Sequence, residues 1–89
     1  MRISPPPELA ARLTDAAAHL RAGRATLDAD GTLSGPREAV EELLASALDE
    51  AAERVGQRAT ALLRGEGTAV ELRAALAEAG ALLDLLESL

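Results

Sequence analysis

Apolar side chains recur at three- and four-residue intervals in three stretches of the chain, and glycines and prolines separate these stretches. This period places the apolar side chains on one side of an α-helix, so each stretch predicts an amphipathic helix. The first helix is expected over residues 6–22, because prolines are tolerated in a first turn whose N–H groups lack intrahelical partners. Ser4 is the expected cap of this helix, and Gly23 is its expected end.

Between the first two helical stretches, residues 24–34 change to a period of two. Ala25 and Leu27 alternate with polar residues, and a turn with a glycine follows at Asp28–Gly31. This pattern favours a short β-hairpin over residues 24–34, with an irregular loop as the alternative. Because strands this short are marginal alone, the hairpin should lie against the helices, and residues 2–4 could supply a third strand.

The second helix is expected over residues 36–64 and the third over residues 69–88. Pro36 suits the first helical position, and Gly65 suits the end of the second helix. Thr68 and Glu71 have the spacing of a capping box, in which the hydroxyl accepts from a backbone N–H of the first turn. The short connection forces the two helices to run antiparallel. The chain is therefore predicted to be a mainly α, three-helix single domain over residues 1–89.

The third helix is apolar over more of its circumference than a surface helix needs. A heptad seam of the kind found in packed helices runs along it, formed by Leu72, Leu76, Ala79, Leu83 and Leu86. Further leucines lie beside this seam in the last two turns, at Leu82, Leu85 and Leu89. At 100° per residue the apolar surface of these turns spans about 160°. We therefore expect something further to cover this end of the helix.

Gly56 and Gly80 interrupt the predicted helices, where a glycine costs about 1 kcal/mol relative to alanine. Both lie in strips of small side chains, together with Ala52, Ala59 and Ala77. The expected reason is a close approach of two backbones at these glycines, within the fold or between subunits. A flat, alanine-lined slot for a planar ligand is the alternative.

Composition narrows the possible functions. Alanine contributes 21 and leucine 17 of the 89 residues, and Cys, Phe, Trp and Tyr are absent. Without cysteine there is no disulfide or thiolate chemistry, and without aromatic rings there is no stacking platform for bases. The net charge of −6 argues against nucleic acid and anionic membranes as partners. No apolar stretch approaches the roughly 20 residues that span a bilayer, and the first residues lack the apolar region of a signal peptide.

Two features carry candidate chemistry. His19 can titrate near neutral pH or bind a transition metal, but it shares a polar stripe with Asp15, which predicts a solvated surface histidine. Residues 26–34 are similar to the middle of an EF-hand calcium loop, except that Thr26 and Arg37 stand where the first acid and the bidentate glutamate belong. A turn without metal is therefore expected. No catalytic residue, metal, cofactor or small-molecule ligand is predicted.

Over its whole length the chain resembles computationally designed, idealised helical proteins. The resemblance is one of style, carried by the segments Ser4–Leu13 and Gly35–Leu44 and by the Ala-Glu-Leu-Arg vocabulary of the helices. It implies a scaffold or self-assembling protein with no evolved activity, and not an enzyme. The alternative is a natural small helical protein–protein interaction module from a high-GC genome. Actinobacterial type VII secretion substrates are similar in length and Ala/Leu character, but this chain lacks their Trp-x-Gly turn.

Self-association is the function that the residues favour most. With 22 large aliphatic residues and no aromatic ring, a monomer is expected to be thinly packed. The broad leucine surface and the strips of small residues are better explained if they meet copies of themselves. We therefore predict a homo-oligomer, with the chain itself as partner, whose interface contains Leu82, Leu85, Leu86, Leu89, Ala52, Gly56, Ala59, Ala77 and Gly80.

Overall fold

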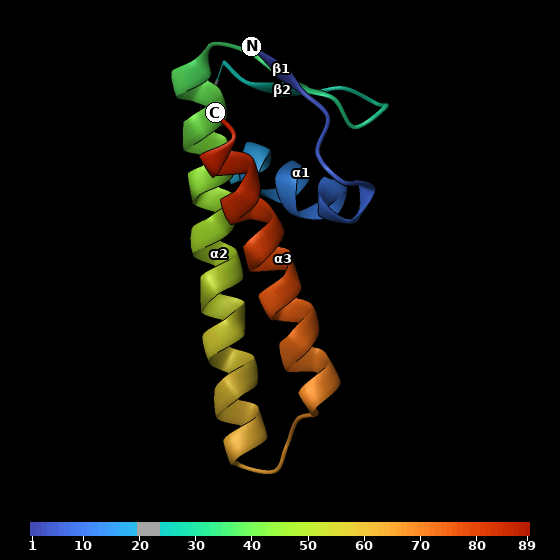
Figure 1. Ribbon diagram of the computed structural model, residues 1–89, viewed down its shortest axis with the longest axis vertical. Coiled ribbons are helices and arrows are strands. Elements are labelled where there is room, and N and C mark those ends of the chain that lie inside the picture. The colour runs from blue at the N-terminus through green and yellow to red at the C-terminus, as the bar shows by residue number, and fades with distance from the viewer. Residues whose placement is uncertain (20–23) are drawn as a thin grey trace.

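The computed structural model describes residues 1–19, without the side chain of residue 19, and residues 24–89. In these ranges the fold is mainly helical, with a small antiparallel sheet whose strands all precede the second helix in the chain (Figure 1). The elements are β1 (Arg2–Ile3), a 3₁₀ turn η1 (Pro7–Leu9), α1 (Ala10–His19), β2 (Thr26–Leu27), β3 (Leu33–Ser34), α2 (Arg37–Leu63) and α3 (Ala69–Glu87).

The N-terminal helix starts later than the sequence pattern predicts. Residues 7–9 form the 3₁₀ turn η1, and regular helix begins only at Ala10. Pro6 occupies the cap position with ψ 141° and no side-chain cap hydrogen bond, so the expectation of a Ser4 cap is wrong. The reason is steric, because a residue that precedes a proline is pushed out of the helical region, and Pro5 and Pro6 both precede one. The predicted helix end at residues 22–23 lies outside the described residues.

The predicted hairpin is confirmed, and so is its third strand. β2 and β1 pair antiparallel with β3 on its two sides, which gives the strand order β1-β3-β2. Leu27 lies opposite Leu33, whose side chain is fully buried. The three short strands thus become stable by lying together over the helices, as strands of this length require.

Gly35 joins the sheet to α2 at a position that only glycine can occupy. Its φ is +146°, and a Cβ added there would lie 2.9 Å from the Cα of Ala25 and 2.9 Å from the carbonyl oxygen of Arg24. Its N–H donates to the Met1 carbonyl at 3.0 Å, which extends the pairing of the N-terminal strand. The sheet and the start of α2 therefore meet backbone to backbone.

The two long helices form the predicted antiparallel hairpin. α2 begins at Arg37, with Pro36 one position earlier than expected, in the cap position. Gly65, with φ +74°, follows the end of α2. The Glu71 N–H donates to Thr68 Oγ1 at 3.2 Å, which confirms the predicted cap of α3.

The core lies at one end of this hairpin, where α1 and the sheet pack on it. Its buried members are Leu9, Leu13, Ala16, Leu33, Val40, Leu43, Leu44, Ala47, Ala51 and Leu82. Leu85, Leu86 and Leu89 pack against this core and are half-buried. Most leucines at this end of α3 are thus at least partly covered within one chain, and Leu83, which is 46% exposed, is the exception.

The molecule is elongated because the other end of the hairpin projects alone (Figure 1). The principal extents are 43 × 23 × 22 Å. The radius of gyration of 13.8 Å exceeds the roughly 12 Å expected for a compact domain of this length. All buried residues of α2 lie between Ala39 and Ala51, so the last 12 residues of this helix include none.

Candidate functional site

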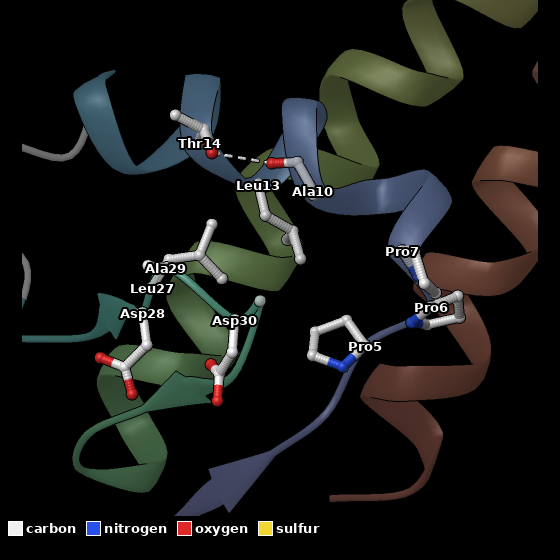
Figure 2. Close-up of a pocket in the computed structure, with 11 residues that line it drawn as sticks. Pro5, Pro6, Pro7, Ala10, Leu13, Thr14, Leu27, Asp28, Ala29 and Asp30 are labelled. Carbon is white, nitrogen blue, oxygen red and sulfur yellow. Dashed lines mark hydrogen bonds between the residues drawn. The ribbon is translucent and has the colours of Figure 1, made fainter.

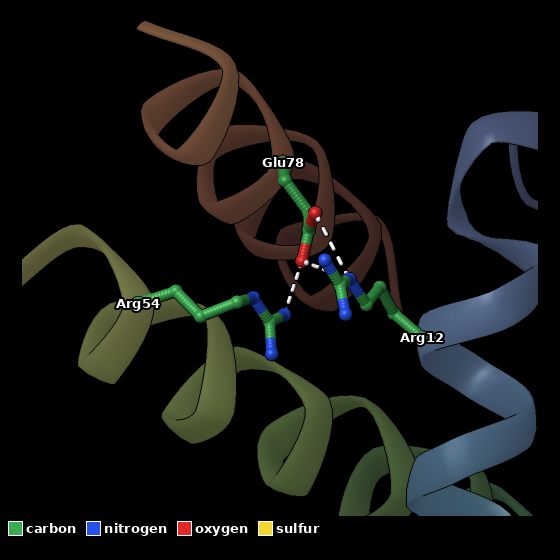
Figure 3. Close-up of polar contacts among 3 residues, drawn as sticks. All are labelled: Arg12, Arg54 and Glu78. Carbon is green, nitrogen blue, oxygen red and sulfur yellow. Dashed lines mark hydrogen bonds and ion pairs between the residues drawn. The ribbon is translucent and has the colours of Figure 1, made fainter. Parts of the chain in front are cut away.

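An ion-pair cluster joins the three helices on the side of the hairpin that carries α1 (Figure 3). The Glu78 carboxylate of α3 accepts from two arginines, Arg12 of α1 and Arg54 of α2. Arg12 Nε lies 3.1 Å from Glu78 Oε1 and 3.2 Å from Glu78 Oε2, and Arg54 Nη2 donates to Oε1. The Arg54 and Glu78 side chains are largely buried, whereas that of Arg12 is 40% exposed. The single Glu78 carboxylate is therefore the hydrogen-bond acceptor for two arginines.

The cluster leaves one donor without an acceptor. Arg54 Nε is buried and has no hydrogen-bond partner among the described residues. An unpaired buried donor costs roughly 1–3 kcal/mol. Sequence reasoning missed this cluster, because Arg12 and Glu78 are far apart in the chain and neither stands out in its own helix. No local pattern signals an ion pair that only the packing of α1 on the hairpin creates.

The opposite face of α3 is apolar and open. Measured around the helix from Glu78, which marks the α1 side, Leu76 and Leu83 lie about 160° and 140° away. Both side chains reach water, with exposed fractions of 52% and 46%. These two leucines belong to the heptad seam seen in the sequence, so the seam reaches water at both positions, although Ala79 between them packs against the core.

The same face of the hairpin is apolar on α2. Measured from Arg54, which also marks the α1 side, Val55, Ala59 and Leu62 lie about 100°, 140° and 80° away. Both sets of angles are counted in the same sense, looking along each helix from its own N-terminus. Because α2 and α3 run antiparallel, this rotation leads from the α1 side to the same face of the helix pair on both helices. We call this surface the open hairpin face, formed by Val55, Ala59, Leu62, Leu72, Leu76, Ala79 and Leu83.

The residues predicted for an interface lie in three different places. Ala52, Gly56 and Gly80 are exposed at the edges of the open hairpin face, and Ala59 is half-buried on it. Ala77 is exposed on another side of α3, where it lines a cavity of about 440 Å³ with Pro6, Glu8 and Leu9. Leu82 is 0% exposed and belongs to the core, with Leu85, Leu86 and Leu89 packed around it. The fold thus assembles only part of the predicted set on one accessible surface.

The two helical glycines do not mark a close approach inside the fold. A Cβ added at Gly56 or Gly80 would meet no atom within 4 Å. The expectation of backbone contact is therefore wrong within one chain. The hollow beside Gly56 is lined mainly by polar residues, among them Glu53, Gln57 and Thr60, and does not form an alanine-lined slot.

The acidic turn has an explanation in its own hydrogen bonds. The Thr32 N–H donates to Asp30 Oδ1 at 2.9 Å, and the Gly31 N–H donates to the Asp28 carbonyl at 2.9 Å. The hydrogen bond from Thr32 lowers the pKa of Asp30 below its usual value. Within the described ranges no group of three or more His, Cys, Asp and Glu side chains could hold a metal ion. The side chain of His19 lies outside the described part of the chain.

A cavity of about 430 Å³ separates this turn from the start of the N-terminal helix (Figure 2). Its walls are largely apolar, with Pro5, Leu13 and Leu27 among them, and the Asp28 and Asp30 carboxylates stand at its rim. Thr14 Oγ1 donates to the Ala10 carbonyl at 2.8 Å, so this hydroxyl is engaged within its own helix. The cavity offers a surface without a set of converging polar groups.

No helix within the described ranges combines the length and the apolar character needed to cross a membrane. Comparison of the chain with family models, curated proteins and solved structures finds no match.

Proposed function

We propose that the chain is a self-associating structural protein whose two copies pair through the open hairpin face. The observation that carries this proposal is the exposure of Leu76 and Leu83 on the face that α1 leaves uncovered. Two such faces packed together form an antiparallel four-helix arrangement in which each hairpin supplies the layer that the other lacks. Self-association also accounts for the small residues at the edges of this face, Ala52, Gly56 and Gly80, which let a second helix approach closely.

The exposed area supports an interface of ordinary size. The chain has an accessible surface of 5600 Å², whereas a compact monomer of 9.2 kDa has about 4,900 Å². The excess of about 700 Å² is close to the roughly 800 Å² that each partner contributes to a standard interface.

The charges along the edge of α3 support an antiparallel pair. Arg73 lies near the projecting end of this helix, and Asp84 lies about 16 Å further along it, at 1.5 Å per residue. A two-fold axis near Ala79 brings Arg73 of one copy beside Asp84 of the other, in two symmetric pairs. A parallel arrangement places Arg73 beside Arg73, which is repulsive.

A designed origin agrees with a purely structural role, because it implies no evolved substrate or partner. The features that support this origin are local signals that all agree with the fold. Examples are the Thr68 cap, the Gly65 helix end and the short connection between α2 and α3. A genomic reading frame that encodes the chain would contradict this origin and favour the natural interaction module.

Solution mass tests the proposed function. Light scattering at a chain concentration of about 100 μM should give the mass of a dimer, because complexes with interfaces of this size are populated at such concentrations. Substituting both open-face leucines, L76E/L83E, should give a monomer that keeps its helical circular dichroism, because neither side chain belongs to the core.

Val70→Glu is the matched control, since Val70 is also a large exposed apolar residue of α3 but lies outside the open hairpin face. This variant should remain a dimer. A monomeric wild-type chain, or a double variant that still associates, would contradict the proposal. A monomer that captures a different helical protein through Leu76 and Leu83 would favour the interaction module.

A further inference from the structure

A second surface lies on the α1 side of the hairpin, where the three helices leave a cavity of about 190 Å³ between them. Arginines from two helices line it, Arg12 of α1 and Arg54 and Arg58 of α2. Figure 3 shows the first two of these side chains. The lining also contains Glu71 and Glu78 of α3. Three cations and two acids leave the lining with a formal charge of +1, in a chain whose net charge is −6.

The two arginines of the cluster have more hydrogen-bond donors than the one carboxylate that they share can accept. Glu78 is a single carboxylate shared by Arg12 and Arg54. The buried Arg54 Nε lacks an acceptor in the described part of the chain. Guanidinium groups present planar forks of donors that suit the oxygens of phosphate and carboxylate, so unused donors of this kind are suited to an oxyanion.

The shape of the cavity favours a small, compact anion. Ala74 and Ala75 form the α3 wall between Glu71 and Glu78, and their short side chains leave the space open. A volume of about 190 Å³ exceeds the roughly 30 Å³ share of one water molecule several times, so a phosphate group fits together with bound water. The arginines approach from different helices, and a tetrahedral group offers acceptor oxygens in several directions.

We propose that this cavity binds a phosphate group, as the free ion or as a monoester, through Arg12, Arg54 and Arg58. The phosphate oxygens accept from guanidinium N–H groups of these arginines that Glu78 leaves unused, and Arg54 Nε, which is buried behind the cavity wall, reports on the change. This inference goes beyond self-association, because the cavity lies on the opposite side of the hairpin from the open hairpin face.

Titration with inorganic phosphate at constant ionic strength tests this site, followed by the ¹⁵N–¹H signal of Arg54 Nε. The signal should shift saturably, with a dissociation constant in the range of about 1 mM that suits a partly exposed site. Arg58→Gln should weaken binding by about tenfold, since one charged hydrogen-bond donor is lost. Arg73→Gln is the matched control, because it removes the same charge from the far side of α3 and should leave the affinity unchanged.

Glu78→Gln should change the phosphate affinity in the opposite direction to Arg58→Gln. Removing the competing carboxylate raises the formal charge of the lining and frees the donors of Arg12 and Arg54, so phosphate should bind more tightly in this variant by about threefold or more. A purely structural ion-pair cluster gives no saturable phosphate shift in either form. If Glu78→Gln does not fold, the contrast between Arg58→Gln and Arg73→Gln decides the question.

A second titration with glycerol phosphate distinguishes the two sources of the group. Tighter binding than inorganic phosphate assigns the site to a monoester, and weaker binding assigns it to the free ion. No saturable shift of Arg54 Nε with either probe overturns the proposal, as does an equal loss of affinity in Arg58→Gln and Arg73→Gln. The L76E/L83E variant should bind phosphate like the wild type, so failure of the dimer and failure of this site are separable.

Discussion

At the scale of single residues, three glycines show how differently one residue type acts in this chain. Gly35 stands where φ is positive and where a Cβ would collide with the backbone of residues 24–25. Gly56 and Gly80 stand in helices with open space around them. In the first case glycine is required by the backbone. In the other two, no contact within the described part of one chain requires it, and in the monomer it only adds conformational freedom to the unfolded chain.

Replacing these glycines by alanine should therefore change stability in opposite directions. Gly35→Ala should lower the free energy of unfolding by about 2 kcal/mol or more, because the strained φ and the 2.9 Å contacts cannot both be relieved. Gly56→Ala should raise it by about 0.5–1 kcal/mol through helix propensity alone. Urea denaturation measures both, in the L76E/L83E background so that association does not contribute. A stabilising Gly35→Ala would refute the close contact with Ala25.

Asp30 provides a prediction of pH dependence at the same scale. Hydrogen bonding from Thr32 lowers the pKa of Asp30 in the folded chain below the usual value of 3.8. Folding therefore favours the carboxylate form, and this contribution is present above the unfolded pKa and lost as the pH falls through the folded pKa.

Asp30→Asn keeps an oxygen that can accept from Thr32 but removes the titration. Below about pH 4 the wild type should lose stability more steeply than this variant, whereas near neutral pH the two curves should run parallel. Thermal unfolding across this range measures the difference. Parallel curves down to about pH 2 would show that the hydrogen bond does not distinguish the two forms of the acid.

At the scale of elements, α3 divides its leucines between two environments. Leu82 belongs to the core and is fully buried, whereas its neighbour Leu83 is nearly half exposed. Both belong to one continuous apolar surface in the sequence. The packing of α1 on one side of the hairpin alone decides which of the two becomes core.

Truncating these neighbours separates the two roles. Leu82→Ala should lower the free energy of unfolding by about 2–5 kcal/mol, because it leaves a cavity in the core. Leu83→Ala should cost less than about 1 kcal/mol in the monomer but should weaken association. Denaturation and sedimentation of both variants check this, and equal destabilisation would mean that the two leucines share one environment.

At the scale of the whole molecule, the two sides of the hairpin have opposite characters. The side that carries α1 holds the core and the arginine cluster, and the other side is an uncovered apolar face. The elongated shape follows from this division, since none of the described elements forms a third layer on the projecting half of the hairpin. A second copy would supply that layer without covering the arginine cluster.

Much of the architecture is readable from local signals. The α2 and α3 boundaries follow from Pro36, Gly65 and Thr68, and the β-hairpin follows from alternation around Asp28–Gly31. These signals act within a few residues, so they need no knowledge of the rest of the fold. The start of α1 was predicted less well, because runs of proline exclude the helix one residue before each ring.

The candidate sites depend on contacts between distant parts of the chain, which no local sequence signal contains. The sequence determined that α3 is apolar over a wide arc and that Gly56 and Gly80 lie among small side chains. Only the tertiary structure decided that Leu82 is core while Leu76 and Leu83 reach water, and that Arg12, Arg54 and Glu78 meet. The physical reason is that periodicity sets which side chains share a face of one helix, whereas the face that is buried depends on where another helix packs.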